Sequence, residues 1–95
     1  MSLFKIINSR KIKKTDGVAS EFEVKILKGN LSLQEEFTLF ETHHKITFKI
    51  LKIIGLTSDH FRIQTSRPIM FDGQWKNTEV NTKDLEQNRK YGYKS

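Results

Sequence analysis

The chain has no cysteine, a single proline and five glycines among its 95 residues. Without cysteine it offers no thiol nucleophile, no thiolate ligand for a metal and no disulfide, which fits a reducing compartment. A domain of this length buries only about two-thirds of the surface that its unfolded chain exposes. We therefore expect one domain with one modest core, built mainly from the seven Phe and the aliphatic residues.

Long apolar runs are also missing. The longest, Ile50 to Leu56, is interrupted by Lys52 and is far shorter than a membrane-spanning helix, which needs about 20 apolar residues. The first residues lack the basic start and apolar segment of a secretory signal. We therefore predict a soluble protein of the cytoplasm that has no membrane partner.

Apolar and polar residues alternate along much of the chain. In Phe22 to Ile26 and in Ile46 to Leu51, successive side chains fall on opposite faces of a strand, so one face can pack while the other meets water. Runs of this kind recur about every ten residues, which is typical of a β-sandwich or barrel. We predict an all-β fold, a small closed or partly open β-barrel of six to seven mostly antiparallel strands.

Turn residues bound the predicted strands. Asp16-Gly17 and Gly29-Asn30 suit tight turns that need a positive φ, and His43 to Lys45 suits a polar hairpin tip. The alternation breaks at Lys52 to Ile54, which indicates a bulge or a barrel corner. Residues 1–80 form the barrel domain, and the polar stretch 81–95 is expected to be a flexible tail. The predicted strands are 4–12, 19–27, 37–41, 46–54 and 60–65, with two less regular ones at 69–71 and 74–80.

Between Phe4 and Ile54, an opening hairpin leads into a strand, a tight glycine turn and a short connector. The best-marked positions are a valine, a residue followed by Gly, two apolar residues and an acidic-apolar pair, here Val24, Lys28-Gly29, Leu31, Leu33 and Glu36-Phe37. Through these residues, the segment from Phe4 to Ile54, about half of the chain, resembles the second domain of translational GTPases such as elongation factor Tu. The resemblance implies a free-standing β-barrel that contacts RNA or other protein domains.

The chain departs from that family in three places. Only Gly17 lies in the first hairpin, which is usually glycine-rich, and Glu35 replaces the usual glycine before Glu36. The chain also has no Gly-x-x-x-x-Gly-Lys loop. Because that loop supplies the backbone donors and the lysine that hold nucleotide phosphates, these 95 residues cannot act as a P-loop GTPase.

Positive charge is in excess. Seventeen Lys and Arg stand against eleven Asp and Glu, a net charge of +6 that favours polyanions such as RNA. Lysines near a hairpin tip can pair with phosphates, and an exposed ring beside them can stack on a base. The alternatives are a solvated turn that keeps an edge soluble and, for the tryptophan, the favoured role of core packing. The candidate nucleic-acid-binding residues are Arg10, Lys11, Lys13, Lys14, Trp75 and Lys76.

Histidines and carboxylates raise the question of metal binding or catalysis. His43 and His44 are adjacent and point to opposite sides of an extended chain, so they cannot easily share an ion with Glu41. Asp59-His60 would need a nucleophile in a strained, Gly-flanked turn. The available hydroxyls, those of Ser58, Thr65 and Ser66, do not lie in such a turn. We therefore predict no catalytic residue, metal or cofactor.

The sequence therefore predicts a non-enzymatic binding module that engages RNA or an acidic protein surface, and the resemblance implies that this module is associated with translation. The alternative is a protein-interaction or structural accessory domain that offers an edge strand, for example 69–71, to a partner. A small enzyme comes third, because it would need a pocket that brings His60, Asp59 or His43 near a second polar cluster.

Overall fold

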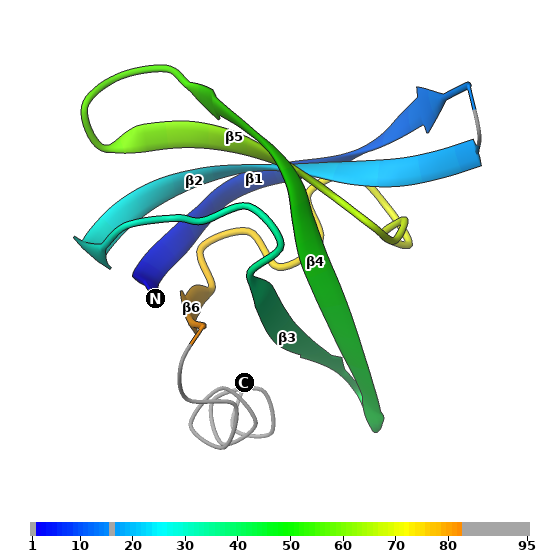
Figure 1. Ribbon diagram of the computed structural model, residues 1–95. Coiled ribbons are helices and arrows are strands. Elements are labelled where there is room, and N and C mark those ends of the chain that lie inside the picture. Colours follow the sequence, from blue (N-terminus) through cyan, green and yellow to red (C-terminus); the bar gives the residue numbers. More distant parts are fainter. Residues whose placement is uncertain (1, 16, 83–95) are drawn as a thin grey trace.

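The computed structural model describes residues 2–15 and 17–82, which form strands and turns (Figure 1). The all-β prediction is confirmed, with six strands. In this part of the chain we find no helix with the length and apolar character that a bilayer crossing requires. Most of the predicted tail, residues 83–95, lies outside the described residues. The strands are β1 (Ser2–Lys14), β2 (Gly17–Gly29), β3 (Glu36–Glu41), β4 (His44–Gly55), β5 (His60–Thr65) and β6 (Glu79–Asn81).

One sheet holds the strands in the order β3-β4-β5-β2-β1-β6, and all neighbouring pairs are antiparallel. Strand β4 changes partner along its length: its first half pairs with β3, and from Ile50 onward it pairs with β5. The register shifts between Ile50 and Lys52, close to the break in alternation, which confirms the predicted bulge. The resulting bend curls the sheet into a nearly closed barrel (Figure 1).

Side chains bridge the gap between the two ends of the sheet. The Thr82 hydroxyl donates to Glu35 Oε2 at 2.6 Å, and Trp75 Nε1 donates to the carbonyl oxygen of Phe40 at 3.0 Å. Part of the β3 edge is thereby covered, and a covered edge is less open to pairing with another chain.

Four phenylalanines from four strands fill the centre of the barrel: Phe4, Phe22, Phe37 and Phe48 are fully buried. Phe22 and Phe48 meet edge to face with ring centroids 5.3 Å apart, and Phe37 stacks on Phe48 at 5.4 Å. Each buried aromatic side chain contributes about 2 kcal/mol through the area it removes from water. The rest of the buried core consists mainly of aliphatic residues from the inward positions: Ile6, Val24, Leu39, Ile50, Ile63, Ile69 and Val80.

The β1–β2 hairpin extends beyond the barrel. Strand β2 loses its β5 partner at Ser20, which lies opposite Thr65. Beyond that point β1 and β2 pair only with each other, and they project from the barrel in Figure 1. We call residues 11–14 and 17–20 the arm.

The connection from β5 to β6 differs from its prediction. Residues 69–71 form no strand, and of 74–80 only the last two belong to β6. The reason is a run of positive φ angles, +87° at Gly73, +63° at Trp75 and +70° at Asn77, which fold this segment into consecutive turns. These turns follow the free edge of β1, where the Gly73 N–H donates to the Ser9 carbonyl at 2.7 Å.

Candidate nucleic-acid interface

The four cations predicted around the first hairpin lie on two different faces. Adjacent residues of a strand point to opposite sides, so Lys11 and Lys13 share one face and Arg10 and Lys14 share the other. Lys11 and Lys13 lie on the same face as Ser9, which is buried toward the barrel interior, and both lysines are exposed. The structure therefore brings together two of the four predicted residues on each side.

Arg10 is already engaged on its own face. Its Nη2 and Nε lie 2.6 and 2.8 Å from Oε1 of Glu21, whose side chain is only 7% exposed. Gln64 Nε2 donates to Glu21 Oε2 at 3.2 Å. The Arg10 guanidinium, itself 58% exposed, is thus held against a buried carboxylate.

A segment of the β5–β6 connection lies beside Lys11. At one end of it, the Ser20 hydroxyl donates to the Arg67 carbonyl at 2.5 Å; at the other, the Lys11 backbone N–H donates to Asp72 Oδ1 at 2.9 Å. Because Ser20 lies opposite Lys11 in the β1–β2 ladder, both contacts are made at the same level of the arm. The segment 67–72 is therefore anchored to both strands of the arm.

Between these two anchors, one apolar side chain points into the core and two point to solvent. Ile69 is buried in the core, whereas Met70 and Phe71 are 64% and 60% exposed. Two adjacent apolar side chains, both more than half exposed, form a small apolar surface beside the basic strand. We call the combination the arm–loop surface, and it consists of Lys11, Lys13, Arg67, Met70 and Phe71.

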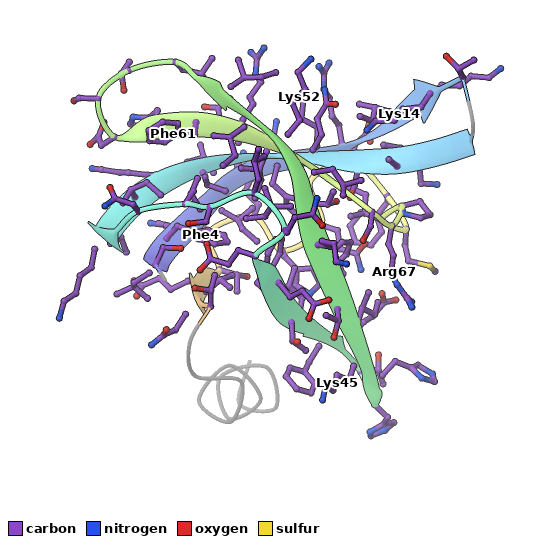
Figure 2. The ribbon with its side chains drawn as sticks, viewed as in Figure 1. Phe4, Lys14, Lys45, Lys52, Phe61 and Arg67 are labelled. Atoms are coloured by element: carbon purple, nitrogen blue, oxygen red, sulfur yellow. The ribbon has the colours of Figure 1, made fainter. Side chains whose placement is uncertain are left out.

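The backbone below this apolar pair is fixed by the buried side chain of Gln74. Gln74 Oε1 accepts from the Met70 N–H at 2.8 Å, and its Nε2 donates to Glu41 Oε2 at 2.7 Å. The Gln74 carbonyl accepts the Ser9 hydroxyl at 2.6 Å. In Figure 2, Arg67 lies between Lys14 on the arm and Lys45 near the β3–β4 tip.

The second predicted group lies elsewhere. Trp75 packs edge to face on Phe48, with centroids 5.8 Å apart, and its indole N–H is bonded to Phe40. It is partly buried against the core, which is the role that the sequence favoured. Lys76 follows it as an exposed side chain of the same series of turns.

The Asp59-His60 pair forms a hydrogen-bonded turn between β4 and β5. Asp59 Oδ1 lies 3.0 Å from His60 Nδ1, and the Thr57 hydroxyl lies 3.3 Å from that same nitrogen. A proton relay needs the two partners on opposite ring nitrogens, so this arrangement is not one. The hydrogen bond from His60, assisted by the Thr57 hydroxyl, lowers the pKa of the exposed Asp59 carboxyl.

The remaining histidines, His43 and His44, lie at and beside the tip of the β3–β4 hairpin, as predicted. In the two described segments, no three His, Asp or Glu side chains come together in a way that could hold a metal ion.

An open hollow lies at the other end of the barrel and has a volume of about 480 Å³. Polar groups from Lys28 and Asp59 stand on its rim. It lies on the side of the barrel away from the arm, and the alternation of apolar and polar residues gave no sign of it. The apolar part of its lining comes from residues near strand ends and from the connector: Ile26, Leu27, Leu31, Ile53 and Phe61.

Comparison with protein-family models, with curated proteins and with solved structures found no match to this chain.

Proposed function

We propose that this chain is a non-enzymatic RNA-binding module that holds RNA on the arm–loop surface. The observation that carries the proposal is the position of Phe71. Its ring is 60% exposed, and the next residue, Asp72, bonds the backbone of Lys11. An exposed ring beside lysines is the combination that binds single strands, because bases stack on rings while cations neutralise phosphates.

Charge on this surface supports the same proposal. Lys11, Lys13 and Arg67 contribute three cations against the nearby carboxylate of Asp72, which accepts the Lys11 backbone N–H through Oδ1. The net charge of +6 adds a long-range attraction for a polyanion. By contrast, Arg10 on the opposite face is paired with Glu21, so we assign it to stability rather than to binding.

We propose RNA rather than DNA as the ligand because residues 4–54 resemble the second domain of translational GTPases. That resemblance also makes a translation-associated role part of the proposal. The barrel shape alone does not distinguish the two nucleic acids, since fold does not determine function.

Salt dependence of RNA binding tests the proposal. We compare the wild type with the triple variant Lys11→Ala, Lys13→Ala, Arg67→Ala by fluorescence anisotropy over a range of salt concentrations. Each lost phosphate contact should flatten the plot of log K against log salt concentration by about 0.7, so three should flatten it by about 2.

The matched control removes two lysines and one arginine from another face of the barrel: Lys25→Ala, Lys52→Ala, Arg62→Ala. All three side chains are exposed on the outer side of the sheet, where Figure 2 shows Lys52. The control should keep a slope close to that of the wild type. Equal slopes for the two triple variants would contradict the proposal.

A second candidate function is protein binding through the exposed pair Met70 and Phe71. Adjacent apolar side chains more than half exposed are a feature of interaction sites. In that case complexes would persist after nuclease treatment and at high salt, and Met70→Ser with Phe71→Ser would abolish them. An acidic protein partner would instead show the salt dependence without sensitivity to nuclease.

A further inference from the structure

We infer that the arm–loop surface prefers unpaired RNA and that one base stacks on Phe71. This inference rests on the proposed function and deepens it by naming the substrate class. Inside a duplex each base is stacked between its neighbours and offers no free face to a protein ring. An unpaired base does offer one, and stacking on an aromatic side chain is the usual way that proteins bind single strands.

Phe71 is the aromatic side chain that is available for this contact. Among residues 2–15 and 17–82, four phenylalanines are fully buried, and the other Phe and Trp side chains apart from Phe71 are at least partly buried. Leaving a Phe ring in water forgoes about 2 kcal/mol of stabilisation. The same short segment buries Ile69, so the exposure of Phe71 does not come from a lack of core nearby.

The backbone that carries the ring is also held in place before any ligand arrives. The Phe71 carbonyl accepts the Gln74 N–H at 3.2 Å. On either side of it, the backbone of Met70 bonds to Gln74 and the side chain of Asp72 bonds to the arm. A side chain on a fixed backbone loses little conformational freedom on binding, so more of the stacking energy appears as affinity.

Lys11 and Lys13 provide the matching contacts for the sugar-phosphate chain. Two residues apart on one face of a strand, their Cα atoms are separated by about 7 Å. Arg67 lies at the other end of the anchored segment. A flexible single strand can place consecutive phosphates against such cations while it turns one base toward Phe71. In a duplex, the positions of the phosphates and the orientations of the bases are both fixed.

The test compares two probes of the same sequence, a labelled single-stranded RNA of about 12 nucleotides and its duplex, a length suited to one small barrel. The wild type should bind the single strand more tightly than the duplex. Phe71→Ala should weaken single-strand binding about tenfold and change duplex binding less than twofold. Phe71→Tyr, which keeps a ring, should retain the preference.

Leu33→Ala is the matched control, because Leu33 is 59% exposed, has no ring and lies in the β2–β3 connection outside the arm–loop surface. It should leave both affinities within about twofold, as expected for an exposed side chain that does not stack. All variants should keep the melting temperature of the wild type, since neither side chain is buried.

The outcomes separate the inference from the proposed function. If Phe71→Ala weakens both probes equally, or neither of them, stacking of an unpaired base is wrong while RNA binding stands. If the wild type binds neither probe in a salt-dependent way, the proposed function itself is overturned.

Discussion

The pairing of Arg10 with Glu21 makes a sharp prediction about stability. Replacing Arg10 by Met keeps much of the side-chain volume and removes the donors at 2.6 and 2.8 Å from Glu21 Oε1. The carboxylate, only 7% exposed, then keeps Gln64 Nε2 as a side-chain donor at 3.2 Å. Breaking a fully buried ion pair costs about 3 to 5 kcal/mol.

That range must be reduced here, because Arg10 is itself 58% exposed and water can reach part of the site. We therefore expect Arg10→Met to lower the free energy of unfolding by about 2 kcal/mol, the size of one hydrogen bond to a charged group. For a domain of this length the melting temperature should fall by about 10 °C. Urea unfolding followed by circular dichroism measures the change directly.

Two controls decide whether the cause is the unpaired carboxylate. Lys11→Met changes the next residue, on the other face of β1 and exposed, so it should shift stability by no more than about 0.5 kcal/mol. Adding Glu21→Gln to Arg10→Met removes the buried charge and should recover at least half of the loss. Equal stability of Arg10→Met and Lys11→Met would refute the reasoning. Below its melting temperature, Arg10→Met should keep the wild-type salt slope for RNA.

Two further predictions concern the other end of the barrel. Gly29 has a φ of +79°, so Gly29→Ala should lower the free energy of unfolding by about 1 kcal/mol. Gly55 does not have a positive φ, and a Cβ added there would lie 3.8 Å from the Phe61 ring. Gly55→Ala should therefore change the free energy of unfolding by less than about 0.5 kcal/mol. Equal losses in the two variants would show that the positive φ of Gly29 is not the cause. The lowered pKa of Asp59 means that its stabilising contribution is present above the ordinary carboxyl pKa and is lost as pH falls through the lowered value. Carbon NMR titration should show the Asp59 midpoint rising in His60→Ala, and an unchanged midpoint would rule out His60 as the main cause.

The strands could be predicted because their side chains must alternate between a core and water. His60–Thr65 was predicted with its observed bounds, and the loss of alternation after Leu51 marked the bulge in β4. Gly29 takes the positive φ that its position in the turn required. These features depend on residues that are close together in the sequence, so a single sequence is enough to predict them.

The β5–β6 connection could not be predicted in the same way. Its shape depends on positive φ angles at two non-glycine residues, Trp75 and Asn77, and such angles have no reliable sequence signal. Its position depends on Gln74, which bonds residues more than thirty positions away. The exposure of Phe71 follows from these distant contacts, and the prediction of a strand at 69–71 was wrong for the same reason.

The separation of the four cations, in contrast, was already present in the sequence. Arg10 and Lys11 are adjacent in a strand, so they had to point to opposite faces. The alternation could not show that Arg10 forms an ion pair with Glu21, or that Asp72 anchors the β5–β6 connection beside Lys11 by a hydrogen bond. Register and long-range pairing supply that information.

We propose that one face of the molecule, the arm–loop surface, binds RNA. An NMR titration of the full chain with the single-stranded RNA tests it most directly. The account predicts shifts in the backbone signals of Lys11, Lys13 and residues 67–72, with little change at Lys25 and Lys52 on the outer face. Shifts confined to the hollow around Ile26 and Asp59 at the opposite end of the barrel, or no shifts at all, would contradict it.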